Sequence, residues 1–237
     1  MELAPGVVID RSAWWARIPA VAALLDHGLN IPAGVTFLVG ENGSGKSTII
    51  EALATTHGLN PEGGSRDARH SSRVTESPLG EALKVIRTPG RRANAYFLRA
   101  ETMHGLYTYL ENLPGSPDGD LHDRSHGEGF LELLARKFRG YGFYLMDEPE
   151  APLSFTSTLG LLARLDALRA DGAQVVVATH SPVLTALPGA TILELDAHGI
   201  RRTSWSDLEI VAHWRRFLDG PEAYLRLSTG SGDAPAR

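Results

Sequence analysis

The chain has 237 residues, of which 43% are hydrophobic, so it is long enough to bury a sizeable core. Its formal charge of −5 argues against a globally basic nucleic-acid-binding protein, and the lack of cysteine excludes disulfides, thiolate metal sites and a cysteine nucleophile. We find no signal-peptide pattern and no apolar run long enough to cross a bilayer. We therefore expect a soluble, cytoplasmic protein without membrane insertion.

Short apolar runs alternate with helical patterns along the chain. Apolar runs without polar alternation are typical of strands covered on both faces, as in parallel sheets. In chain order, the pattern predicts a strand at 35–39, a helix at 47–54, a short amphipathic stretch at 79–86, a strand at 96–98, a helix at 130–138, a strand at 143–146, a helix with a stripe formed by Leu159, Leu162, Leu165 and Leu168, strands at 174–178, 191–195 and 200–205, and helical material at 206–218. This order predicts an α/β fold.

The organisation predicted from composition is a single domain over residues 1–227, with an insertion at 58–124 and a disordered tail at 228–237. The insertion is rich in Pro, Gly, Ser and arginine. Its basic residues could follow a nucleic-acid backbone, but a solvated loop is the favoured alternative because no aromatic residues alternate with them. The arginines concerned are Arg66, Arg69, Arg73, Arg87, Arg91 and Arg92.

A glycine-rich segment lies between the first predicted strand and helix. The run from Gly40 to Ser47 fits the pattern G-x-x-x-x-G-K-[ST], whose backbone N–H groups converge on phosphate oxygens at a helix amino end. In such a loop Lys46 reaches the β- and γ-phosphates, and Ser47 ligates Mg²⁺. The predicted nucleotide-binding residues are Gly40, Glu41, Asn42, Gly43, Ser44, Gly45, Lys46, Ser47 and Thr48.

The predicted strand at 143–146 ends in two consecutive acids, Asp147 and Glu148. Adjacent acids at a strand end are usually only solvated, but the phosphate loop favours a catalytic interpretation. In this Walker B order, Asp147 holds the magnesium shell and Glu148 orients and deprotonates water. Glu150 is interpreted instead as a polar residue of the following turn.

His180 follows the predicted strand at 174–178 and Thr179. A lone histidine is more often structural than catalytic. Because open α/β sheets bind ligands at the carboxyl ends of their strands, we favour contact between His180 and the γ-phosphate or the attacking water.

Ser125, Gly127 and Glu128 precede the helical pattern that leads to Asp147. With the phosphate loop, the paired acids and His180, they form an ordered set that resembles the ABC-type ATPases, a class of P-loop NTPases. The resemblance covers about Gly34 to Leu195, with His126 and Arg124 departing from the signature consensus. It implies that Ser125, Gly127 and Glu128 bind the nucleotide of a neighbouring subunit, although an ordinary capped helix start also explains these residues.

The resemblance further implies binding of ATP and Mg²⁺, hydrolysis that depends on Glu148, His180 and Lys46, and an ATP-dependent homodimer. The lack of a membrane span brings the chain closer to the soluble branch of recombination, repair and chromosome-maintenance ATPases, and to small predicted ATPases, with a role in DNA maintenance or defence. Two alternatives remain open, namely an ATP-gated DNA clamp with slow hydrolysis and the nucleotide-binding subunit of a transporter. A further protein partner is compatible with each of them.

Two weaker features also follow from the resemblance. Where the family has a glutamine after a strand, this chain has Glu101, which is predicted as a water or Mg²⁺ ligand, with a surface helix start as the alternative. Trp14 and Trp15 lie where the family often has an aromatic that stacks on adenine, and core packing is the alternative for at least one of them.

Overall fold

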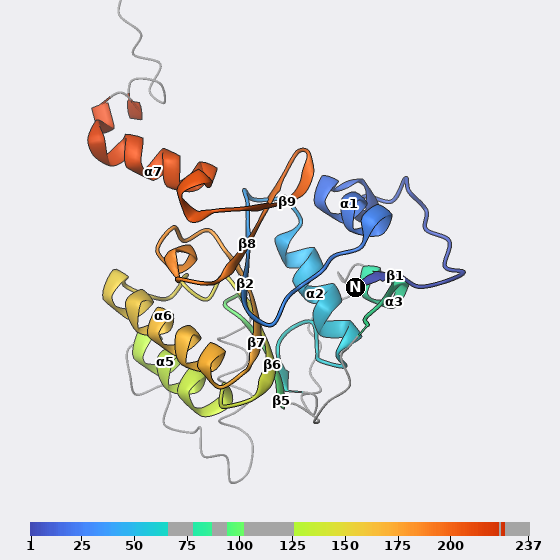
Figure 1. Cartoon of the computed structure of the whole chain (residues 1–237), viewed down its shortest axis with the longest axis horizontal. Coiled ribbons are helices and arrows are strands. Elements are labelled where there is room, and N and C mark those ends of the chain that lie inside the picture. Colours follow the sequence, from blue (N-terminus) through green and yellow to red (C-terminus); the bar gives the residue numbers. More distant parts are fainter. Residues whose placement is uncertain (66–77, 87–93, 102–125, 223, 226–237) are drawn as a thin grey trace, which may run out of the picture.

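The computed structural model describes residues 1–65, 78–86, 94–101, 126–222 and 224–225 (Figure 1). The predicted insertion lies largely outside these residues and the predicted tail wholly outside them, so both stay predictions. In chain order the elements are β1 (Glu2–Leu3), η1 (Trp15–Arg17), α1 (Pro19–His27), β2 (Gly34–Val39), α2 (Lys46–Thr56), β3 (Gly64–Ser65), α3 (Leu79–Ala82), β4 (Leu83–Lys84), β5 (Asn94–Arg99), α5 (His126–Lys137), β6 (Gly142–Asp147), α6 (Phe155–Ala170), β7 (Gln174–Thr179), η2 (Leu184–Ala186), β8 (Thr191–Asp196), β9 (Gly199–Thr203), η3 (Trp205–Asp207) and α7 (Glu209–Asp219).

The central sheet has, among the described residues, seven strands in the order β3-β5-β6-β7-β2-β8-β9. The strands from β5 to β8 run parallel, while β3 and β9 pair antiparallel at the two edges. The inner strands are buried over most of their length, which explains their unbroken apolar sequences. The predicted α/β fold with a mostly parallel sheet is therefore confirmed.

Helices cover both faces of this sheet, with α1 and α2 on one side and α5 and α6 on the other (Figure 1). The alternation of side chains along β7 divides its apolar residues between the two layers. Val175 and Val177 pack with α5 and α6, whereas Val176 and Ala178 pack with α1 and α2. Two apolar layers on one sheet thus hold the carboxyl ends of its strands in fixed positions.

The predicted leucine stripe on α6 is partly wrong. Leu165 and Leu168 are fully buried as expected, but Leu159 is 45% exposed and Leu161 is buried in its place. A constant spacing of three residues drifts around a helix that has about 3.6 residues per turn. The face that packs on the sheet is therefore formed at alternating spacings of three and four residues, starting from Thr158.

Two other predicted elements are shorter than expected. Of the amphipathic stretch at 79–86, only Leu79–Ala82 is helical, because Leu83 and Lys84 pair with the amino-terminal strand β1. The last strand ends at Thr203, and the helical material that follows is divided into η3 and α7. The start of α7 lies at the carboxyl end of β8, where the N–H of Glu209 donates to Glu194 Oε1 at 3.1 Å.

Because of the register of the sheet, the loops that follow β2, β6 and β7 begin close together. Val39 pairs with Thr179, and Asp147 pairs with Ala178, so β2, β6 and β7 end side by side. The phosphate loop, Glu148 and His180 therefore begin at the same edge of the sheet, although they are far apart in sequence.

Candidate functional site

The phosphate loop depends on glycine at several positions. Gly43 and Gly45 have φ values of 81° and 99°, a left-handed conformation that other residues rarely adopt. A Cβ on Gly40 would lie 2.3 Å from the carbonyl oxygen of Leu195, so the loop packs directly on strand β8. Gly45 is also the residue from which helix α2 begins. The loop is thus a compact turn with a helix amino end behind it, which suits phosphate binding.

Lys46 is buried beneath this loop, with 4% of its surface exposed. Its Nζ donates hydrogen bonds to the carbonyl oxygens of Gly40 and Glu41, at 2.8 and 3.1 Å. Burial lowers the pKa of Lys46, and the nearby carboxylates of Glu148 and Asp147 oppose that shift. Within the part of the chain that the structure describes, the ammonium of Lys46 donates to neutral carbonyl oxygens, which phosphate oxygens could replace as acceptors.

Asp147 ends β6 with a nearly fully buried side chain. Burial raises the pKa of Asp147 to about 6, although Arg99 and the hydroxyl of Ser47 act in the opposite direction. Ser47 Oγ donates to Asp147 Oδ1 at 3.3 Å. Because Mg²⁺ prefers oxygen ligands, the adjacent hydroxyl and carboxylate fit the metal that the resemblance implies.

Glu148 has a backbone conformation that is rare outside glycine, with φ at 49°. Its N–H donates to the carbonyl oxygen of Ala178 at 3.0 Å, which fixes it to the neighbouring strand β7. Its Oε1 lies 3.3 Å from His180 Nε2, with 41% of the Glu148 side chain and 29% of the His180 side chain exposed. The two atoms are close to each other but do not form a hydrogen bond. The fold therefore brings the predicted base and the predicted histidine together at the edge that holds Asp147.

Glu101 lies in the turn after β5, and its side chain is 79% exposed. The residue of this segment that approaches Asp147 is Arg99, whose Nε lies 3.7 Å from Asp147 Oδ2. Arg99 also pairs with Glu51 on α2 at 2.5 Å and with Glu101 at 3.4 Å. The group from this segment that lies beside Asp147 is therefore the guanidinium of Arg99. Ligation of water or Mg²⁺ by Glu101 stays a prediction.

The two tryptophans have different environments. Trp15 is 6% exposed and packs in the core layer with α1 and α2, as the packing alternative predicted for one of the pair. Trp14 is 65% exposed. The next residues along the chain approach the phosphate loop, since Ile18 limits the space at Gly45. Trp14 is therefore the tryptophan that remains a candidate for adenine stacking.

The signature residues are described only in part. Gly127 and Glu128 lie on α5, while Ser125 lies outside the described residues. Helix α5 is anchored by Phe130, which is fully buried against the sheet. The binding of a neighbour's nucleotide by Ser125, Gly127 and Glu128 stays a prediction. The six arginines of the insertion also lie outside the described residues.

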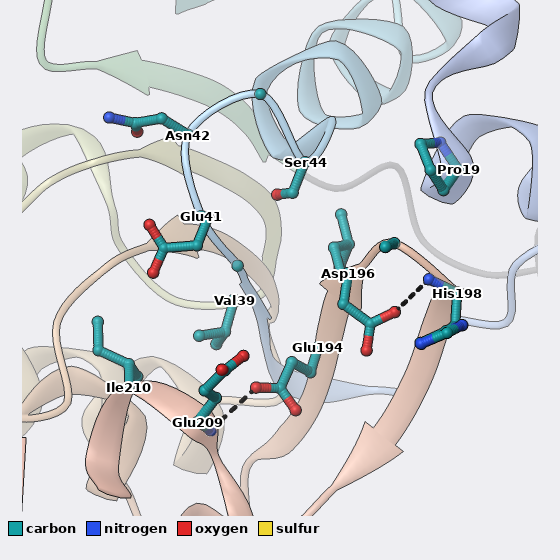
Figure 2. A pocket seen from close by; sticks show the side chains of 14 residues that line it. Pro19, Val39, Glu41, Asn42, Ser44, Glu194, Asp196, His198, Glu209 and Ile210 are labelled. Atoms are coloured by element: carbon teal, nitrogen blue, oxygen red, sulfur yellow. Dashed lines mark hydrogen bonds between the residues drawn. The ribbon is translucent and has the colours of Figure 1, made fainter. Parts of the chain in front are cut away.

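A cavity of about 480 Å³ lies on the other side of the phosphate loop, between its first residues, the β8–β9 turn and the start of α7 (Figure 2). Four carboxylates line it, from Glu41, Glu194, Asp196 and Glu209. Lys46, Asp147 and Glu148 are not part of its lining. Because acidic groups repel a triphosphate, this cavity is poorly suited to phosphate groups.

The loop, its lysine and the acidic strand end together define a P-loop NTPase. The model of the AAA domain family AAA_23 matches residues 25–88. The chain is 30% identical over 191 residues to the ribose import ATP-binding protein RbsA of Burkholderia pseudomallei strain K96243, a match that covers 68% of this chain and 37% of that protein. It is 29% identical over 188 residues to a putative ABC transporter ATP-binding protein of Streptomyces coelicolor strain A3(2), covering 72% of this chain and 33% of the relative.

These sequence matches and the ordered motifs identify the chain as an ABC-type P-loop ATPase. The chain spans only about a third of the length of these curated relatives. Among solved structures, a dimeric bacterial ABC transporter cassette, MJ0796, matches at a TM-score of 0.44 and 17% identity, covering 76% of this chain and 89% of that one. This likeness is too distant to indicate a function. Within the described residues, no helix combines the length and the apolar character that a bilayer crossing requires.

Two contributors to the site were missed from the sequence. Arg99 could have been found from its place at the end of a parallel strand, where the register sets it beside Asp147. Glu150 was interpreted only as a turn residue, and the structure shows that it binds the segment that carries His180. The sequence places Thr179 at the end of a strand but does not indicate that its hydroxyl binds Glu150.

Proposed function

We propose that this ATPase binds Mg·ATP in a composite site of a nucleotide-sandwiched homodimer and hydrolyses it to ADP and phosphate, with assembly coupled to the nucleotide state. The observation that carries this proposal is the convergence of Lys46, Asp147, Glu148 and His180 at one edge of the sheet. A phosphate loop alone would only bind nucleotide. The exposed carboxylate beside a histidine adds the groups that a water attack requires.

The proposal assigns a role to each of these groups. Lys46 releases its loop carbonyls to bind the β- and γ-phosphates, while Ser47 and Asp147 would hold Mg²⁺, which neutralises charge on the phosphates when bound. Glu148 accepts a proton from the attacking water. His180 binds the γ-phosphate end and keeps the Glu148 carboxylate in place.

The homodimer follows from the resemblance and from the open side of the site. Glu148 and His180 remain partly exposed in a single copy of the chain. In the proposal, Ser125 and Gly127 of the second copy cover this side, with the amino end of α5 directed at the phosphates. Because the γ-phosphate contacts both copies, ATP stabilises the dimer and hydrolysis weakens it.

The Glu148→Gln variant tests this proposal, because it keeps nucleotide binding while removing the base. We expect the variant to bind ATP, to hydrolyse it at least ~100-fold more slowly than the wild type, and to become dimeric by light scattering when ATP is added. A matched control is Asp166→Asn, which removes an exposed carboxylate paired with Arg169 on α6. A Glu148→Gln protein that binds ATP and stays monomeric at saturation contradicts the composite site.

A second candidate function is that of a transporter's ATP-binding subunit. It is supported by the relatives, which are a ribose import ATP-binding protein and a putative ABC transporter ATP-binding protein. Affinity purification of Glu148→Gln protein with ATP from detergent-treated membranes of the native cells tests it. Recovery of a membrane-spanning protein in constant proportion supports this candidate, and recovery of the homodimer alone contradicts it.

A further inference from the structure

The loop between β6 and α6 reaches the end of β7 through the side chain of Glu150. Glu150 Oε1 accepts a hydrogen bond from the Thr179 hydroxyl at 2.5 Å and a second from the backbone N–H of His180 at 2.9 Å. The second bond acts on the residue that is paired with Glu148. Glu150 therefore binds the chain on both sides of the peptide bond that leads into His180.

Thr179 is a fixed donor in this arrangement. Its side chain is fully buried, and its Oγ1 accepts a hydrogen bond from the N–H of Ser181 at 2.9 Å. Because that bond occupies the hydroxyl oxygen, the hydroxyl proton is directed to Glu150. The backbone from Thr179 to Ser181 is thus held on both sides of His180 by one carboxylate and one hydroxyl.

Glu150 is also rigidly connected to Glu148. The N–H of Ala151 donates to the carbonyl oxygen of Glu148 at 3.0 Å, and the N–H of Leu153 donates to that of Glu150 at 2.8 Å. These bonds form a tight turn whose first residue has the strained left-handed conformation of Glu148. A change in the position of Glu150 must therefore change the distance between Glu148 and His180.

A direct chemical role for Glu150 fits the structure less well. Its Oε1 already accepts two hydrogen bonds, and its Oε2 is buried without a hydrogen-bond partner among the described residues. The buried Oε2 cannot meet an attacking water, and Oε1 is already occupied by two protein donors. A base must reach the proton that it removes.

We infer that Glu150 is a positioning residue for ATP hydrolysis, which sets His180 against Glu148 and links this pair to the β6–α6 loop. The inference rests on the proposed function. The amide oxygen of a glutamine can accept the same two hydrogen bonds, whereas alanine can accept neither. The role therefore depends on an acceptor oxygen and not on the negative charge.

The test measures kcat by phosphate release and ATP affinity by calorimetry, for the full chain with Mg²⁺. We expect Glu150→Ala to lower kcat by ~10- to 100-fold, because small errors in the position of a reacting group have effects of this size. ATP affinity is expected to stay within about threefold, since no phosphate ligand changes. We expect Glu150→Gln to retain kcat within about threefold of the wild type and Asp166→Asn to match the wild type.

Thr179→Val provides an independent measurement, because it removes one donor and keeps the side-chain volume. It is expected to lower kcat by ~3- to 10-fold, and to add no further loss when combined with Glu150→Ala, since both act through one contact. If Glu150→Ala does not fold, the kcat values of Thr179→Val and Glu150→Gln test the positioning role instead. The inference is overturned if Thr179→Val has the kcat of the wild type. It is also overturned if the kcat of Glu150→Gln falls by more than about threefold.

The outcomes also separate this inference from the proposed function. A wild-type protein that binds ATP without hydrolysing it, or a Glu148→Gln protein as fast as the wild type, contradicts the proposed function itself. A wild type that hydrolyses ATP and a Glu150→Ala protein of equal kcat contradict only the positioning role. A Glu150→Ala protein that folds but has lost ATP binding contradicts it as well, because the loss then lies in binding.

Discussion

The buried carboxylate of Asp147 makes a measurable prediction about stability. Its pKa of about 6 lies above the ordinary value of 3.8, and burial is the main cause. Between these values the folded protein keeps a proton that the unfolded chain has released. The free energy of unfolding therefore falls as pH rises through this window, and the difference amounts to about 3 kcal/mol once pH exceeds the folded-state pKa.

The Asp147→Asn substitution isolates this effect, because asparagine has nearly the same size and no charge to bury. We expect the variant to gain about 3 kcal/mol of stability relative to the wild type between pH 4 and pH 8. Urea unfolding of both proteins at a series of pH values, without nucleotide, measures the difference directly. Titrating groups that do not interact with Asp147 affect both proteins equally and cancel in the comparison.

Two results would refute this reasoning. A stability difference that stays constant from pH 4 to pH 8 would show that Asp147 is not disfavoured by burial. A difference that changes with the opposite sign would show that Arg99 and Ser47 outweigh burial. Adding Mg·ATP supplies a further check, since it should stabilise the wild type far more than the variant if Asp147 binds the metal.

Three further predictions concern the loop, the tryptophans and the composite site. Gly40→Ala should lower ATP affinity by at least ~10-fold in calorimetry, because its Cβ would collide with a carbonyl oxygen of β8 and displace the loop. Trp15→Ala should lower the free energy of unfolding by about 3–5 kcal/mol in urea, whereas Trp14→Ala should leave stability nearly unchanged and weaken ATP binding by ~3- to 10-fold. Mixing inactive Lys46→Ala and Ser125→Ala proteins should restore phosphate release towards about a quarter of wild-type activity, as expected if one of the two sites is intact in each mixed dimer and half of the dimers are mixed. No recovery on mixing would contradict sharing of the site.

The elements at the site were predictable because their sequence patterns are local. Strand β2, the loop and helix α2 follow each other within one continuous segment, and glycine has few other reasons to recur at these spacings. The unbroken apolar residues of β6 and β7 predicted buried parallel strands, and the polar residues after them predicted the edge where ligands bind.

The remaining contacts of the site depend on which strands are neighbours and on the path of a turn, and neither can be read from a local sequence pattern. Arg99 lies beside Asp147 only because β5 and β6 pair in parallel in this register. The bond from Glu150 to His180 depends on the path of a turn, and a carboxylate in a turn is usually solvated. Along α6, the side chains that face the sheet could be identified only once the rotation of the helix was known, so Leu161 was missed and Leu159 was included.

The four-membered ion cluster around Arg99 has a consequence for cation selectivity. One guanidinium faces the carboxylates of Glu51, Glu101 and Asp147. When all are ionised, three negative charges and one positive charge give these groups a sum of −2. A single divalent ion returns that sum to zero, while a sodium or potassium ion leaves an excess of one negative charge. In the proposed metal site at Asp147, this charge balance favours a divalent ion over a monovalent one.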